Sequence, residues 1–71
     1  MYTRIRDLRE DADLFQKQIA EILHIHEKTY RRYEVGEREI PFNIAIMLAK
    51  YYNVSLDYIA GLINKPYPPN R

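Results

Sequence analysis

Residues 16–36 read QKQIAEILHIHEKTYRRYEVG, from Gln16 to Gly36. Their apolar side chains follow two separate helical periodicities, which one straight helix cannot hold. The first is formed by Ile19, Ala20 and Leu23, and the second by Tyr30 and Tyr33. Ile25 lies between them, at the place where the first periodicity loses its phase. The pattern predicts two helices, over residues 16–23 and 27–35, joined by a tight turn around one buried aliphatic side chain.

Two helices joined in this way form a helix-turn-helix, and the second helix of such a pair can enter the major groove of DNA. Gly36 is suited to the left-handed residue that ends the second helix. The turn itself often carries glycine in such motifs, because one of its residues takes a positive φ. This chain has His24, Ile25 and His26 there instead, and histidine is tolerated at positive φ at some energetic cost.

The segment before this pair, residues 2–14, is predicted to be a first helix with Thr3 as its N-cap. It carries an apolar stripe at helical spacing. The stripe consists of Ile5, Leu8 and Ala12. Arg9 lies next to the stripe, where a guanidinium needs an acidic partner or must extend to solvent.

The segments after the pair are predicted to be a long helix and a short one. The long helix, residues 42–52, follows Pro41 and is apolar over most of its circumference, so we expect it to be the central core element. Its main stripe consists of Ile44, Met47, Leu48 and Tyr51. Ser55 is predicted to be the N-cap of the short fifth helix. Residues 64–71 contain three prolines, so the chain is predicted to be one domain, residues 1–63, with an extended proline-rich tail.

The composition restricts the class of protein. The 71 residues allow one domain at most, and a content of 46% hydrophobic and 30% charged residues is typical of a globular chain. The chain has no cysteine, which excludes disulfides and thiolate zinc sites. No apolar run approaches the roughly 20 residues that span a bilayer, and the N-terminus lacks the apolar core of a signal peptide, so we expect a cytoplasmic protein. The net charge of +1 leaves nucleic-acid binding to the local placement of charge.

The first turn of the helix at residues 16–23 is a candidate site for an anion. Phe15 precedes it and has no side chain that can cap, so the amides near Gln16 and Lys17 need another acceptor. A positively polarised helix end beside a glutamine and a lysine suits a DNA phosphate. A surface helix capped by water explains the same residues equally well.

The order of these features resembles the Cro and phage-repressor-like helix-turn-helix family, also called XRE-type regulators. The resemblance covers residues 5–61 and rests on QKQIAE at 16–21, YEVGER at 33–38, IP at 40–41 and LAKYYNVSLDYIAG at 48–61. It implies an all-α, five-helix, lambda-repressor-like DNA-binding domain in a bacterial or phage transcriptional regulator, with repression favoured over activation. Helices two and three form the helix-turn-helix in such a domain.

The resemblance also implies roles for single residues. The positions that reach base edges in similar proteins are His26, Glu27, Lys28 and Arg32. Gln16 and Arg38 match positions that lie at the phosphate backbone in similar proteins. Beside the resemblance, Lys17 and Thr29 are expected to contact phosphates, and Arg31 is expected to hold a phosphate or to make no contact. Arg9 and Glu34 match an ion pair that locks the first helix to the third, which gives Arg9 its partner.

The chemistry of these side chains ranks them. Arg32 is the better base reader, because a guanidinium can grip O6 and N7 of guanine together. Glu27 can accept from cytosine N4 or simply stabilise the helix N-terminus, and the second role is favoured. Three positions depart from the family: His24 replaces the usual glycine, His26 the usual Ser or Thr cap, and Val35 the common Asn, a donor near the phosphates.

Other kinds of site are less favoured by the sequence. A metal site at His24, His26 and Glu27 is not expected, because no third histidine and no cysteine completes tetrahedral zinc coordination. Most of the seven tyrosines fall on core stripes, so packing is favoured over base stacking, with Tyr67 as the exception. Nothing resembles a catalytic constellation, and we expect no enzyme activity, no cofactor and no small-molecule ligand.

The leading hypothesis is therefore a sequence-specific regulator that binds double-stranded DNA with residues 27–35 in the major groove. We expect a homodimer through the fifth helix and the tail, where apolar surface is left over. That surface consists of Tyr58, Leu62, Ile63 and Tyr67. The alternative is a protein-interaction module of the same fold, such as an antitoxin or an anti-repressor. The low net charge, Glu27, Glu37 and the absence of Asn at position 35 favour that alternative weakly.

Overall fold

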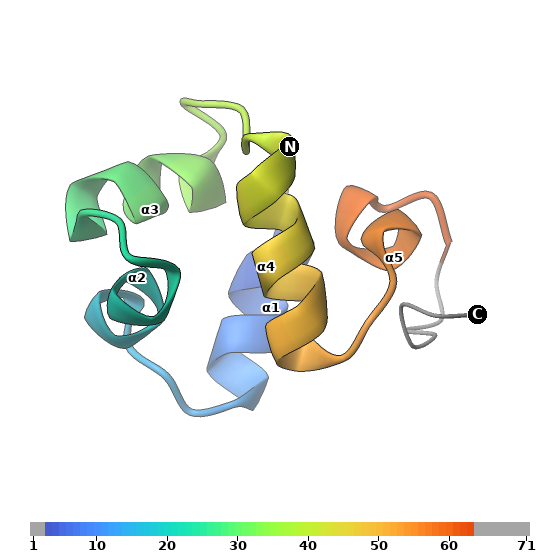
Figure 1. Ribbon diagram of the computed structural model, residues 1–71, viewed down its shortest axis with the longest axis horizontal. Coiled ribbons are helices and arrows are strands. Elements are labelled where there is room, and N and C mark those ends of the chain that lie inside the picture. The colour runs from blue at the N-terminus through green and yellow to red at the C-terminus, as the bar shows by residue number, and fades with distance from the viewer. Residues whose placement is uncertain (1–2, 64–71) are drawn as a thin grey trace.

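A computed structural model of the chain describes residues 3–63, which form five α-helices without a strand (Figure 1). The helices are α1 (Thr3–Asp11), α2 (Gln16–Leu23), α3 (Glu27–Val35), α4 (Phe42–Tyr52) and α5 (Leu56–Ala60). The predicted all-α, five-helix fold is confirmed, and α2, α3 and α4 have the predicted bounds. The proline-rich tail, residues 64–71, lies outside the described residues.

The helix α4 runs through the middle of the fold (Figure 1). In that view α2 and α3 lie on one side of α4, α5 lies on the other, and α1 lies behind it. The helix α2 packs on α3 and α4, α1 packs on α3 and α5, and α4 packs on α5. The pair formed by α2 and α3 is therefore held by α1, near the start of the chain, and by α4.

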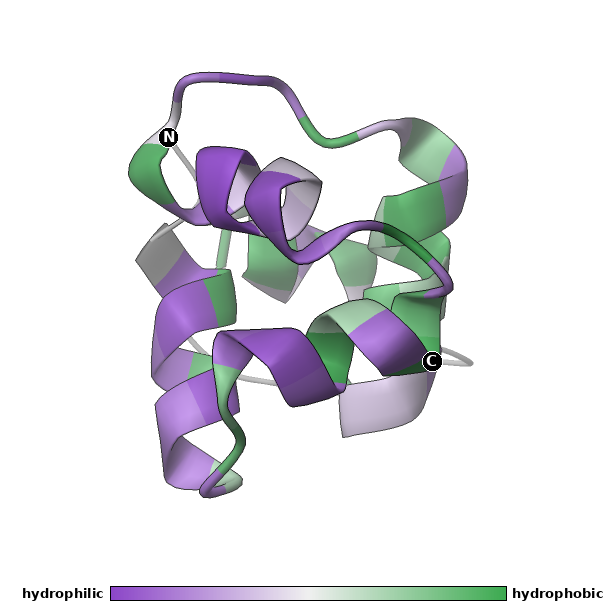
Figure 2. Cartoon of the chain, turned by 90° about the vertical axis from the view of Figure 1, so that its left-hand side faces the viewer, coloured by the Kyte–Doolittle hydropathy of each residue, from purple (hydrophilic) through white to green (hydrophobic). Residues whose placement is uncertain are grey.

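The core draws residues from every helix. Its buried apolar members are Ile5, Ile19, Ala20, Leu23, Tyr30, Tyr33, Ile44, Leu48, Ala49, Val54 and Ile59. Figure 2 views the molecule from the side of α2 and α3, and hydrophilic residues dominate the helices nearest the viewer. The pair thus turns its apolar residues toward α4 and its polar residues toward solvent, as the two periodicities predicted.

Each helix from α2 to α5 ends at a left-handed residue. These residues are His24 (φ 59°), Gly36 (φ 83°), Asn53 (φ 58°) and Gly61 (φ 81°). After each of them the chain donates a backbone hydrogen bond to the preceding turn, as from Ile25 N to Ala20 O at 3.0 Å. The expected positive φ in the turn thus falls on His24. At the start of α5, Ser55 Oγ accepts from Tyr58 N at 3.1 Å, which confirms the predicted cap.

Three expectations from the sequence are wrong, one about the end of a helix and two about the burial of side chains. The first helix ends at Asp11 instead of Leu14, because Asp13 takes a left-handed conformation (φ 58°) and turns the backbone out of the helix. Ala12 is consequently exposed instead of lying on an apolar stripe. Tyr51 is 47% exposed instead of buried, and its ring packs edge-on against Tyr52.

Candidate nucleic-acid interface

The turn between α2 and α3 is built by three residues with different tasks. His24 reverses the chain through its left-handed conformation. Ile25 packs half-buried against the core, so the expectation of a buried aliphatic side chain is met in part. His26 has an extended backbone and caps α3, because its Nδ1 accepts from Lys28 N at 3.2 Å. An imidazole therefore takes the place of the hydroxyl that usually caps such a helix.

The helix α3 separates its side chains by face. Tyr30 and Tyr33 are buried in the core, and the Glu34 side chain lies between α3 and α1 with only 2% exposed. The basic side chains of the helix point to solvent instead. Because its inner face is fixed by packing, α3 presents its outer face as a rigid surface.

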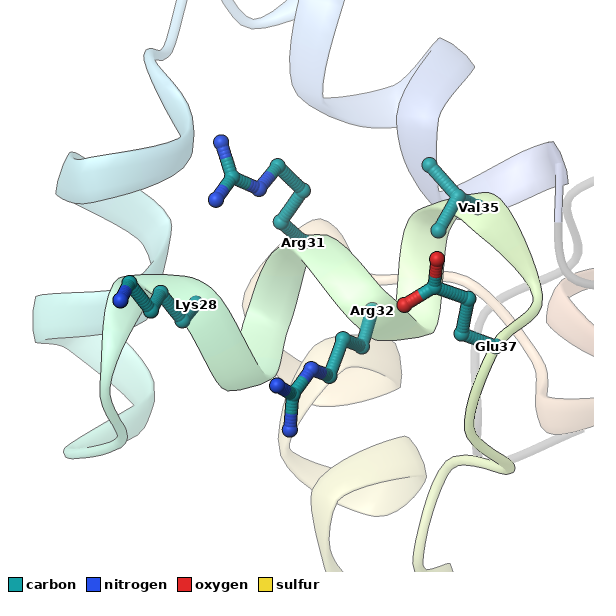
Figure 3. A pocket seen from close by; sticks show the side chains of 5 residues that line it. All are labelled: Lys28, Arg31, Arg32, Val35 and Glu37. Carbon is teal, nitrogen blue, oxygen red and sulfur yellow. The ribbon is translucent and has the colours of Figure 1, made fainter.

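The exposed basic residues of α3 line a hollow on this outer face (Figure 3). The hollow is formed by Lys28, Arg31, Arg32, Val35 and Glu37. In Figure 3 the two guanidinium groups extend from successive positions of α3, and Lys28 projects from the turn before them. We call this surface the basic hollow. Its cations are of the kind that bind phosphates and the acceptor atoms of bases.

Glu34 holds three helices together at one carboxylate. Its Oε2 accepts from Arg9 Nε of α1 at 2.6 Å and from the Tyr30 hydroxyl at 2.5 Å. Its Oε1 accepts from Arg9 Nη2 at 3.2 Å and from Gln16 Nε2 of α2 at 3.0 Å. Arg9 also donates through Nη1 to the carbonyl of Leu14 at 2.8 Å, which fixes the connection between α1 and α2.

The environment of this cluster shifts several pKa values. Burial alone would raise the pKa of Glu34, but hydrogen bonds from Arg9, Tyr30 and Gln16 bring it below the ordinary value of 4.5. The hydrogen bond to Glu34 raises the pKa of Arg9. Burial, and then the hydrogen bond to Glu34, raises the pKa of Tyr30. The cluster therefore consists of a charged pair and a neutral phenol at neutral pH.

The structure gives Gln16 a partner inside the protein. One N–H of its carboxamide is used by Glu34, which leaves one N–H and the carbonyl oxygen for other partners. The backbone amides of Gln16 and Lys17 have no hydrogen-bond acceptor within residues 3–63, and the Lys17 side chain is exposed beside them. The arrangement is compatible with a bound anion at the start of α2.

Sequence reasoning missed two polar contacts at this site. Gln18 Oε1 accepts from the backbone N–H of Phe15 at 2.7 Å, so a side chain from the first turn of α2 caps the residue that precedes the helix. A glutamine at the third helical position was the available signal. The Tyr30 hydroxyl was expected only as part of a core stripe, and its bond to Glu34 depends on the burial of both residues.

The four predicted base-reading residues divide between two hollows. Lys28 and Arg32 line the basic hollow. His26 and Glu27 line a second hollow at the N-terminal end of α3, together with Lys17 of α2. The two hollows lie along the same helix, one at its N-terminal end and one on its outer face.

Two of the five residues predicted to contact phosphates line one of the hollows. Arg31 belongs to the basic hollow and Lys17 to the second one. Thr29 is half-buried on α3, and Arg38 is exposed just after Gly36. Neither Thr29 nor Arg38 lines either hollow.

Comparison with known proteins identifies the family. A family model described as "Helix-turn-helix" matches residues 5–59, which include most of α1 and almost all of α5. The chain belongs to this helix-turn-helix family. The match covers the supporting helices as well as the α2–α3 pair, except for the first residues of α1 and the last residue of α5.

Relatives of this helix-turn-helix chain carry regulatory names. The uncharacterized HTH-type transcriptional regulator YobD of Bacillus subtilis (strain 168) is 38% identical over 92% of this chain and 58% of its own length. The cryptic phage CTXphi transcriptional repressor RstR of Vibrio cholerae is 35% identical over 76% of this chain and 49% of its own. The HTH-type transcriptional regulator ImmR of Bacillus subtilis (strain 168) is 34% identical over 82% of this chain and 46% of its own.

The chain spans about half the length of these curated relatives. No solved structure gives a significant match to the helix-turn-helix chain. None of the helices within residues 3–63 is both long enough and apolar enough to cross a membrane. Within the same residues, His, Asp and Glu side chains do not form a group of three that could hold a metal ion.

Proposed function

We propose that this chain is the DNA-binding part of a transcriptional regulator, acting as a repressor, with α3 in the major groove of double-stranded DNA. The observation that carries the proposal is the basic hollow on the outer face of a helix whose inner face is locked to the core. The names of the relatives, two transcriptional regulators and one phage transcriptional repressor, support it.

The roles proposed for the side chains follow from their chemistry. Arg32 pairs with the O6 and N7 atoms of a guanine, and Lys28 contacts the neighbouring base edge. His26 and Glu27 read the bases at the N-terminal end of α3. Phosphate contacts come from Gln16, Lys17, Thr29, Arg31 and Arg38. Arg9 and Glu34 contact no DNA in this proposal and instead fix the orientation of α3 relative to α1.

A homodimer is proposed as the binding unit, because one module makes few phosphate contacts. Its support is Leu62, which follows α5 and is 75% exposed. Tyr58 contributes less apolar surface than expected, because Arg4 lies over its ring at 4.2 Å and also donates to the Ile63 carbonyl at 3.3 Å. The expected contribution of Tyr67 lies outside the described residues. Sedimentation analysis of Leu62→Asp tests the proposal, and an unchanged dimer content would contradict it.

Selection of duplexes from a random DNA library, followed by fluorescence anisotropy, tests the function itself. Arg32→Ala is expected to weaken binding to the selected duplex by about 5- to 150-fold and to relax the preference at one base pair. Lys28→Ala is expected to weaken binding as well. Lys50→Ala removes an exposed lysine of α4 and serves as the control for charge. Equal affinities for all four proteins would rule out groove docking through α3.

The competing function, a protein-interaction module, is favoured by apolar side chains at the two ends of the α3–α4 connection. Val35 is 56% exposed and Phe42 is 71% exposed. Salt separates the two functions, since DNA binding weakens with a slope of about −0.9 in log–log form per neutralised phosphate. Two results together would favour the protein-interaction module: no duplex is selected from the library, and the affinity for a natural protein partner does not change with salt.

A further inference from the structure

The basic hollow contains one acid, Glu37, whose position is fixed by the backbone. Its N–H donates to the carbonyl of Arg32 at 3.0 Å, directly after the left-handed Gly36 that ends α3. Its side chain is exposed and lines the hollow together with Lys28, Arg31 and Arg32. In Figure 3 the Glu37 carboxylate is turned back toward the last turn of α3, beside Val35.

No contact within the described fold accounts for this carboxylate. Among residues 3–63, the salt bridges and side-chain hydrogen bonds do not include Glu37. The C-terminal end of a helix carries partial negative charge, so an acid just beyond α3 is electrostatically unfavourable for folding. Neither a direct contact nor the helix end therefore explains an acid at this position.

We propose that Glu37 is a specificity-determining residue that keeps DNA phosphates out of the basic hollow. Two kinds of DNA group can enter a hollow lined by arginine and lysine: an anionic phosphate and the neutral edge of a base. Glu37 repels the full negative charge of a phosphate more strongly than the partial charges of a neutral base edge. Val35 adds to the discrimination, because its 56% exposed side chain offers no donor to a phosphate oxygen.

The consequence differs between the two modes of DNA binding. Binding to an arbitrary sequence depends almost entirely on phosphate contacts, so Arg32 can then pair only with the backbone, close to Glu37. Binding to a preferred sequence places a base edge in the hollow, where the carboxylate costs less. Glu37 thus lowers affinity for arbitrary DNA more than affinity for the preferred site, which is specificity obtained through repulsion.

This inference rests on the proposed DNA-binding function, and Glu37→Gln tests it. The variant keeps the backbone bond to Arg32 and the size of the side chain while it removes the charge. Anisotropy is measured for the selected duplex and for a scrambled duplex of the same length and composition, in a series of salt concentrations. Glu39→Gln is the matched control, because Glu39 is exposed two positions later and does not line the hollow.

Glu37→Gln is expected to bind the scrambled duplex about two- to fivefold more tightly, which is the range of an exposed charge pair, and to gain less on the selected duplex. Glu39→Gln is expected to leave the ratio of the two affinities unchanged. Equal gains on both duplexes, or a ratio for Glu37→Gln that matches Glu39→Gln, would overturn the role of Glu37 while leaving DNA binding in place. If the parent protein binds neither duplex and Arg32→Ala changes nothing, the proposed function fails and the inference fails with it.

Discussion

Arg9 and Glu34 lie 25 positions apart in the chain, and their Nε and Oε2 atoms meet at 2.6 Å between α1 and α3. The two side chains are 12% and 2% exposed, so Glu34 is buried and Arg9 is largely buried. An intact buried ion pair adds little net stability, because the desolvation of both charges offsets their attraction. In this fold the pair fixes the position of α3 relative to α1 and α2, because the same carboxylate also accepts a hydrogen bond from Gln16 of α2.

Removal of one partner of this pair is expected to be strongly destabilising. Arg9→Ala leaves the Glu34 carboxylate buried without its counter-ion, and we expect a loss of about 3–5 kcal/mol in the free energy of unfolding. Urea denaturation followed by circular dichroism measures it. The control is Arg6→Ala, which breaks the exposed pair with Glu10 on the same helix and is expected to cost about 0.5 kcal/mol or less. Similar losses for the two variants would contradict the structural role of Arg9.

The lowered pKa of Glu34 predicts a loss of stability in acid. The unfolded chain binds a proton at this carboxyl near the ordinary value of 4.5, whereas the folded chain resists protonation to lower pH. The contribution of Glu34 is therefore fully present above pH 4.5 and is lost as the pH falls through the lower folded-state pKa. Unfolding curves collected between pH 7 and pH 2 test this, with Glu10→Gln as the control for an exposed carboxyl. An acid slope that persists unchanged in Glu34→Gln would refute the assignment.

His24→Gly is expected to stabilise the protein. His24 holds φ at 59°, a conformation that costs a residue with a Cβ atom more than it costs glycine. We expect a gain of about 0.5–1 kcal/mol after the greater freedom of glycine in the unfolded chain is subtracted. Asn53→Gly, at φ 58°, is the comparison and is expected to gain less, because asparagine tolerates this region. Thermal unfolding of both variants measures the difference, and a loss of stability in His24→Gly would show that the imidazole has a stabilising contact.

Two substitutions of His26 separate its capping role from base reading. His26→Ala removes the acceptor for Lys28 N and is expected to cost about 1 kcal/mol, whereas His26→Ser supplies a hydroxyl cap and is expected to keep the stability. If the imidazole reads a base, His26→Ser still loses preference for the selected duplex. Unfolding and anisotropy measurements on the same two proteins give both answers. Unchanged DNA preference in the serine variant would limit His26 to the cap.

The bounds of α2, α3 and α4 could be predicted because the apolar spacing agrees there with the residues that start and end helices. Gly36 and Asn53 end helices where the periodicity ends, and Pro41 precedes the next one. The end of α1 could not be predicted in this way. It depends on Asp13 in a left-handed conformation and on the tertiary bond from Arg9 to the Leu14 carbonyl, which no local pattern reports.

The candidate site likewise has one part that the sequence predicts and another that depends on the tertiary structure. The outward placement of Lys28, Arg31 and Arg32 follows from the helical period alone, and the structure places all three on the exposed face. The division of the base-reading candidates into two hollows depends on how α2 and the residues after α3 approach that face. The place of Glu37 in the basic hollow also requires the backbone path after Gly36, so a list of charges could not distinguish it from Glu39.

The left-handed helix ends carry a consequence for protein engineering. They are closed by backbone hydrogen bonds, as at Gly36 and the residue after it, and the inner face of α3 is held by Tyr30, Tyr33 and Glu34. The outward side chains of α3 take part in neither. These outward positions can therefore be varied together, and a library of side chains at them can be screened for new target sequences on an unchanged scaffold.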